Sequence, residues 1–143
     1  MKHVIITGGT GEIGSHIVKS LINNGYYLSI VGRNKDNFNR LIASIKYNEN
    51  IQFFKADVSN NAEVVNIFSA LEKSNHNLYG LINAAGVQGP IGEFIEGDMN
   101  AWLNNLSINL LGTANMIHSF INVNGKNNNN KKIINFSGGG ATS

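Results

Sequence analysis

The chain has 143 residues, 42% of them hydrophobic and 14% charged, a composition typical of one globular domain large enough to bury a core. The formal net charge is only +2, which does not suggest a nucleic-acid partner. There is no cysteine, so disulfides, thiolate metal sites and cysteine nucleophiles are excluded, and the four histidines are too scattered to suggest any metal site.

The first predicted elements are a buried strand at 4–6, a glycine-rich loop and an amphipathic helix whose apolar stripe is Ile13, Ile17, Leu21 and Ile22. The loop matches the Gly-x-Gly-x-x-Gly fingerprint, and helix N–H groups with close backbone approach suit a dinucleotide pyrophosphate. A turn that binds no nucleotide is the alternative. The candidate cofactor-binding residues are Thr7, Gly8, Gly9, Thr10, Gly11, Glu12, Ile13 and Gly14.

The next elements continue the alternation of strands and helices. Strands are predicted at 27–31 and 51–55, and the helix between them has its apolar stripe at Phe38, Leu41, Ile42 and Ile45. Ser59 or Asn60 is expected to cap a third helix, with Glu63 completing a capping box. The predicted buried face of that helix is Val64, Val65, Phe68 and Leu71.

The last elements are a strand at 78–82, a glycine-rich loop, a long helix at roughly 98–123 and a strand at 132–136. The predicted stripe of the long helix is Trp102, Leu103, Leu106, Leu110, Ala114, Ile117 and Ile121. The lysines near 126–132 flank an asparagine run, which indicates a solvated loop. No aromatic residues interleave with them to stack on bases, and no segment has membrane-spanning length, so we expect no nucleic acid, no membrane and a cytosolic location.

This order predicts one α/β domain over residues 1–143, with a doubly wound parallel sheet of five strands in the order 3-2-1-4-5. The first and fourth strands would then lie side by side at the topological switch point. The loop Thr7–Gly14 and the segment Asn83, Ala84, Ala85, Gly86 should therefore face each other, with a nucleotide between them.

These segments together resemble the short-chain dehydrogenase/reductase family over nearly the whole chain. The loop Thr7–Gly14 resembles the family's cofactor loop, Asp57-Val58 its adenine-contacting pair, and Asn83–Gly86 its Asn-Ala-Gly-type motif. Asn109 resembles the helix asparagine that supports a proton relay, and Ser137 the catalytic serine, although the register leaves that place on Ser137 or Gly138.

The resemblance implies a Rossmann fold and hydride transfer between a nicotinamide and a small carbonyl or alcohol substrate. Each motif also has a purely structural interpretation, in which Asp57 only starts a turn or caps a helix, Asn83 stabilises a strand end, Gly86 marks an ordinary turn, and Asn109 faces solvent. Glu12 stands where the family often has glycine, and its carboxylate would repel a pyrophosphate. We therefore expect this side chain to turn outward.

The end of the second strand bears on the choice of cofactor. An NAD site would place a carboxylate there, about 20 residues beyond the glycine loop, to hold the ribose 2′-hydroxyl. This chain has Gly32-Arg33 instead, with no carboxylate before Asp36. Arginine suits a 2′-phosphate, so we expect NADP(H) as the cofactor. A merely solvent-exposed Arg33 is the alternative.

The resemblance also implies a general-acid tyrosine with a lysine four residues later, beyond the serine strand. No tyrosine of this chain has such a lysine, so we expect a cofactor-binding portion, C-terminally truncated relative to the family, that does not turn over alone. The exposed fifth strand and long helix predict a homo-oligomer, or marginal solubility of the isolated chain. A non-catalytic nucleotide-binding or interaction module is an alternative. A sugar-nucleotide epimerase or reductase is another, because the spacing of Thr7-Gly8, Gly11 and Gly14 also resembles the family's extended branch.

Overall fold

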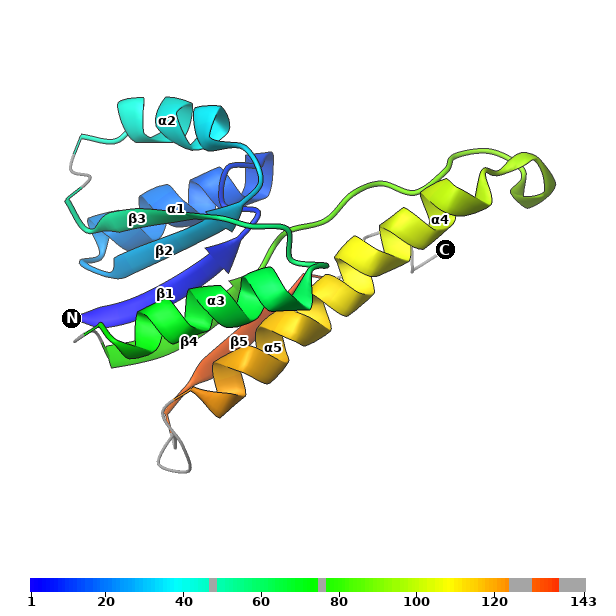
Figure 1. Ribbon diagram of the computed structural model, residues 1–143. Coiled ribbons are helices and arrows are strands. Elements are labelled where there is room, and N and C mark those ends of the chain that lie inside the picture. Colours follow the sequence, from blue (N-terminus) through cyan, green and yellow to red (C-terminus); the bar gives the residue numbers. More distant parts are fainter. Residues whose placement is uncertain (47–48, 75–76, 124–129, 137–143) are drawn as a thin grey trace.

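The computed structural model describes residues 1–46, 49–74, 77–123 and 130–136, and in them a parallel sheet is flanked by helices on both faces (Figure 1). The strands are β1 Lys2–Thr7, β2 Tyr27–Gly32, β3 Ile51–Lys55, β4 Asn77–Asn83 and β5 Lys132–Asn135. The helices are α1 Glu12–Asn23, α2 Lys35–Ala43, α3 Asn61–Glu72, α4 Met99–Leu106 and α5 Thr113–Asn122. The strand order β3-β2-β1-β4-β5 confirms the predicted doubly wound sheet.

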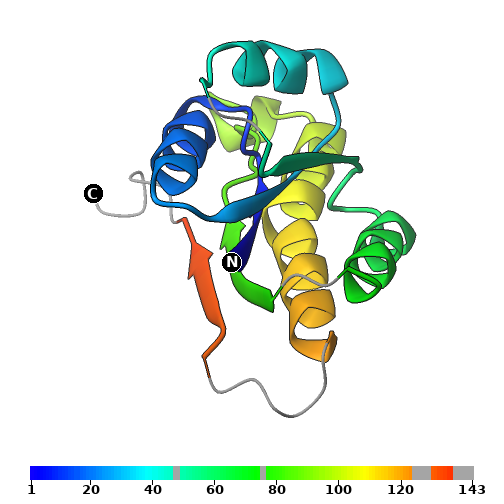
Figure 2. The same cartoon turned by 90° about the vertical axis from the view of Figure 1, so that its left-hand side faces the viewer.

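The two faces of the sheet carry separate hydrophobic cores. Ile5 of β1 packs into the core built with α3 and α5, whereas Val4 and Ile6 pack into the core built with α1 and α2. This alternation follows from the period of two in a strand, which sends successive side chains to opposite faces. The two helical layers are visible on either side of the sheet in Figure 2.

The buried faces of α1 and α3 differ from the prediction in both directions: each contains a residue that was not predicted, and one predicted residue of each is exposed. Ile13 is 60% exposed and Val65 is 45% exposed. Gly14 and Val18 form the buried line of α1, and Ile67 joins the core side of α3. Each predicted stripe was therefore displaced around the helix, because periodicity identifies an apolar sector but does not set its edge.

The capping prediction for α3 is confirmed in outline. Asn60 Oδ1 accepts from the backbone N–H groups of Ala62 and Glu63, at 3.1 and 3.4 Å. Glu63 does not complete the expected reciprocal bond to the backbone of Asn60. Its carboxylate accepts from the side-chain amide of Asn60 at 2.9 Å and from the backbone N–H of Asp57 at 2.8 Å. Glu63 therefore ties the start of α3 to the end of β3.

The long helix begins and ends close to the predicted residues, with Asp98 as its N-cap. Its interior differs, because Ser107–Gly112 is a π-helical segment between α4 and α5. A short 3₁₀ turn, Phe94–Glu96, precedes α4.

The predicted stripe of the long helix was wrong at most of its positions, although Ile117 packs against the core. Leu103, Leu106, Leu110 and Ile121 are between 51% and 67% exposed. The residues that face the core are instead Ile108, Gly112, Met116, Ser119 and Phe120. A π turn contains more residues than an α turn. Residues chosen at the α-helical spacing therefore do not all face the core in a helix that contains a π-helical segment.

Strand β5 lies at one edge of the sheet and pairs with β4. All four of its residues are exposed. This agrees with the prediction of an uncovered edge at the fifth strand.

Candidate functional site: a crevice between two loops

The loops that follow β1 and β4 contact each other directly. The backbone N–H of Ala84 donates to the carbonyl of Thr7 at 3.2 Å, and the backbone N–H of Ala85 donates to Thr7 Oγ1 at 3.1 Å. Gly8 has a φ of +65°, and a Cβ at this position would lie 2.5 Å from the carbonyl oxygen of Ala84. Only glycine fits this backbone and this approach. The two loops thus face each other, as the strand order predicts.

The N-terminus of α1 lies at this contact and has no side-chain cap. Its N-cap is Gly11, whereas α2, α3 and α4 are capped by the side chains of Asn34, Asn60 and Asp98. A Cβ on Gly14 would collide with the carbonyl oxygen of Gly8, so the loop can fold tightly over the helix only with glycine here. An uncapped helix N-terminus leaves N–H donors and a partial positive charge for an anion.

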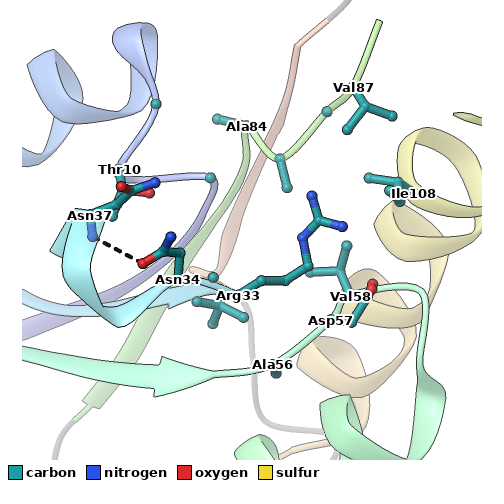
Figure 3. Close-up of a pocket in the computed structure, with 16 residues that line it drawn as sticks. Thr10, Arg33, Asn34, Asn37, Ala56, Asp57, Val58, Ala84, Val87 and Ile108 are labelled. Atoms are coloured by element: carbon teal, nitrogen blue, oxygen red, sulfur yellow. Dashed lines mark hydrogen bonds between the residues drawn. The ribbon is translucent and has the colours of Figure 1, made fainter. Parts of the chain in front are cut away.

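A cavity of about 250 Å³ opens beside this helix end (Figure 3). It is bounded by the loops that follow the first four strands, which all end at the same edge of the parallel sheet. Its lining residues are Gly8, Thr10, Gly11, Val31, Gly32, Arg33, Asn34, Asn37, Ala56, Asp57, Val58, Ala84, Ala85, Gly86, Val87 and Ile108.

Arg33 brings a positive charge to this cavity from the end of β2, and Asp57 lines the same cavity from the end of β3. Asp57 Oδ1 accepts from the hydroxyl of Ser59 at 2.7 Å and from its backbone N–H at 2.9 Å. The bond from the Ser59 hydroxyl holds the pKa of Asp57 below its ordinary value against the opposing effect of burial, and the charge of Arg33 contributes. Asp57 is thus an ionised turn residue that also faces the cavity.

A second cavity, of about 530 Å³, lies on the other side of the same loop. It shares the wall 84–87 with the first cavity, and Ile13 reaches it from α1. Asn83, which is only 5% exposed, donates from its side-chain amide to Asn135 Oδ1 at 2.9 Å. The remaining lining residues are Gln88, Asn109, Thr113 and Phe136. One extended ligand could therefore contact both cavities along a common wall.

Asn109 lies in the π-helical segment and contacts the shared wall. Its Oδ1 accepts from the backbone N–H of Val87 at 2.8 Å, and its Nδ2 donates to the carbonyl of Val87 at 2.9 Å. The hydroxyl of Thr113 donates to the backbone carbonyl of Asn109 at 2.9 Å. The side chain of Asn109 therefore holds the loop that follows β4.

Most of the predicted site residues line one of the two cavities. The exceptions among the described residues are Thr7, Gly9, Glu12 and Gly14, which line neither. Thr7 and Gly14 shape the loop from behind, and the side chain of Glu12 is exposed. Ser137 lies outside the described residues.

The predicted site did not include seven residues that line the first cavity, which are Val31, Gly32, Asn34, Asn37, Ala56, Val87 and Ile108. It also did not include four that line only the second cavity, which are Gln88, Thr113, Asn135 and Phe136. Asn34 carried a recognisable signal, because its Oδ1 caps α2 by accepting from Asp36 and Asn37. Val87 and Ile108 are ordinary apolar residues, and only the fold brings them to the crevice.

The sequence model of the short chain dehydrogenase family matches residues 2–142, nearly the whole chain. The chain belongs to the short-chain dehydrogenase family. The matched range includes the glycine loop, the uncapped helix and the Asn83–Gly86 segment. Within the described residues, no helix is both long and apolar enough to cross a membrane, and no three metal-binding side chains group together.

Similar proteins include both reductases and epimerases. The chain is 30% identical over 125 residues to the bifunctional UDP-glucose 4-epimerase and UDP-xylose 4-epimerase 1 of Pisum sativum, covering 80% of this chain and 32% of that protein. It is 28% identical over 116 residues to short-chain dehydrogenase reductase 5 of Arabidopsis thaliana, covering 81% and 44%. The structure of ElxO with NADP bound superposes with a TM-score of 0.74 at 28% identity, covering 82% of this chain and 48% of that one. The chain thus spans less than half the length of each of these proteins.

Proposed function

We propose that this chain is the cofactor-binding portion of an NADP(H)-dependent oxidoreductase. The observation that carries the proposal is Arg33, which lines the same cavity as the uncapped end of α1. Among the described residues that line this cavity, the only carboxylate is Asp57, which comes from β3 and not from β2. An arginine without a carboxylate at the end of β2 favours a 2′-phosphate over a free ribose 2′-hydroxyl.

Each part of the crevice then has a role toward the dinucleotide. The loop Thr7–Gly14 and the N-terminus of α1 bind the pyrophosphate. Asp57 and Val58 contact the adenine, and Arg33 binds the 2′-phosphate with charge-assisted hydrogen bonds. The segment Asn83–Gly86 lies along the ligand between the two cavities. The structure of ElxO with NADP bound supports this cofactor class.

In the complete protein, the nicotinamide would exchange a hydride with a small carbonyl or alcohol compound. Asn109 keeps the second cavity in shape by holding Val87. Ser137 would polarise the substrate oxygen if the catalytic serine position falls on it and not on Gly138. The chain contains no tyrosine followed four residues later by lysine. We propose that it binds NADP(H) without transferring hydride.

Titration of the chain with NADPH, followed by the fluorescence of the reduced nicotinamide, tests this function. Saturable binding with one site per chain is expected. NADPH absorbance should stay constant when a panel of aldehydes and ketones is added. Absence of binding at millimolar NADPH would exclude the proposed cofactor, and steady NADPH oxidation would exclude the proposal that the chain is inactive.

A sugar-nucleotide epimerase is the second candidate. The observation in its favour is the similarity to the Pisum sativum epimerase. The test compares UDP-glucose with carbonyl compounds as ligands of this chain by calorimetric titration. Saturable binding of UDP-glucose without binding of the carbonyl compounds would support the epimerase over the reductase.

We also propose that the exposed face of the long helix binds a second copy of this chain. Leu103, Leu106, Leu110 and Ile121 are exposed along it. Met99–Asn122 contains no aspartate, glutamate, lysine or arginine, so two copies can meet there without repulsion between like charges. Sedimentation should show a dimer that Leu106→Asp converts to a monomer. A wild-type monomer at micromolar concentration would contradict the proposal.

A further inference from the structure

Two asparagines of the long helix hold the backbone of Val87. Asn109 pairs with both its N–H and its carbonyl. Asn105, one turn earlier in α4, donates from its Nδ2 to the same carbonyl at 2.7 Å, the shorter of the two bonds to this oxygen. The carbonyl oxygen of Val87 therefore accepts two hydrogen bonds, both from side-chain amides of the same helix.

The loop beyond Val87 packs closely on Asn105. A Cβ at Gly89 would lie 3.3 Å from Asn105 Nδ2 and 3.4 Å from its Cγ. The side chain of Asn105 is half-buried under this backbone. Asn105 therefore bonds to the loop at Val87 and leaves little room for a side chain at Gly89, whereas Asn109 bonds to it at Val87 and lies close to Gly86.

The position of Val87 matters because it lines both cavities. A shift of its peptide would change the wall that the two cavities share. We propose that Asn105 is a positioning residue for the cofactor: it acts through Val87 to set the wall along which NADP(H) lies. This inference rests on the proposed function. Asn105 itself is not among the described residues that line either cavity.

The test compares Asn105→Ala with the wild-type chain. Asn104→Ala is the matched control, since Asn104 is an exposed neighbour on the same helix and the substitution has the same helix propensity effect. Asn105→Asp provides a second variant of nearly equal size, whose ionised carboxylate accepts hydrogen bonds but cannot donate one. Two quantities are measured: the dissociation constant for NADPH, and the hydrogen-exchange rate of the Val87 amide by NMR.

We expect both Asn105 variants to raise the NADPH dissociation constant about fivefold, the effect of losing one ordinary hydrogen bond. The Val87 amide should exchange faster in both, although its own acceptor is Asn109 Oδ1 and not Asn105. Asn104→Ala should change neither quantity. A purely structural Asn105 would alter the free energy of unfolding and leave the NADPH affinity of the folded protein unchanged.

The outcomes separate the two proposals. If the wild-type chain binds NADPH and both Asn105 variants bind it equally well, this inference is wrong and the proposed function stands. Unchanged Val87 exchange in the variants would also overturn the inference. If the wild-type chain does not bind NADPH, the proposed function and the inference fail together.

Discussion

The backbone N–H of Ala85 donates to the buried hydroxyl oxygen of Thr7 at 3.1 Å, and this bond joins loops that are 78 residues apart in the sequence. It lies at the topological switch point, where β1 and β4 are neighbours. The hydroxyl thus helps to fix the spacing of the crevice in which we place the cofactor.

Thr7→Val should therefore destabilise the chain, although the two side chains have nearly the same shape. The variant leaves the Ala85 N–H without its acceptor, at a cost of about 1–3 kcal/mol in the free energy of unfolding. Urea unfolding followed by circular dichroism measures this loss. Thr7→Ser keeps the hydroxyl and should retain more of the stability. Equal stability of the valine variant and the wild type would show that the bond contributes nothing.

Gly14→Ala should lower stability, even though alanine normally favours a helix. The added Cβ would collide with the carbonyl oxygen of Gly8, and relieving such overpacking costs about 1–3 kcal/mol. Ser20→Ala, at an exposed position of the same helix, is the control and should be neutral or slightly stabilising. Thermal unfolding of both variants measures the difference. An increased melting temperature for Gly14→Ala would contradict the close packing of this loop.

The lowered pKa of Asp57 predicts a pH-dependent contribution to stability. Because the pKa is lower in the folded than in the unfolded chain, the contribution is fully present above the ordinary value of about 3.8 and is lost as the pH falls through the folded-state pKa. The stability difference between wild type and Asp57→Asn should therefore shrink as the pH falls below about 4. Urea unfolding from pH 6 to pH 3 measures it. A difference that does not change over this range would show that Asp57 has no lowered pKa.

The strand order and the meeting of the two loops could be predicted because they depend on local patterns. One buried strand is the apolar run before Gly8, and another comes directly before the segment Asn83–Gly86. The rule that crossovers are right-handed then predicts which strands are neighbours in the sheet. Asn60 likewise carried its capping signal in its own residue type and in its spacing from Glu63.

The buried face of the long helix could not be predicted in the same way, because the helix carries apolar residues on two sides. Leu106 and Leu110 are exposed, while Ile108 and Met116 are buried. Hydrophobic spacing does not say which side meets the sheet, and the π-helical segment changes the spacing midway. The contacts of Asn105 and Asn109 with Val87 depend on the same altered spacing, so they could not be predicted from the sequence either.

Arg33 provides the most direct test of the account, through the dissociation constants of NADPH and NADH measured on the same chain. NADPH should bind more tightly, and Arg33→Ala should weaken NADPH binding about tenfold or more with little effect on NADH, because the arginine meets only the 2′-phosphate. Arg40→Ala, which removes an exposed arginine from the last turn of α2, is the control and should change neither constant. Equal affinity for the two nucleotides in the wild-type chain, or an Arg33→Ala variant that binds NADPH as well as the wild type, would contradict the assignment of an NADP(H) site.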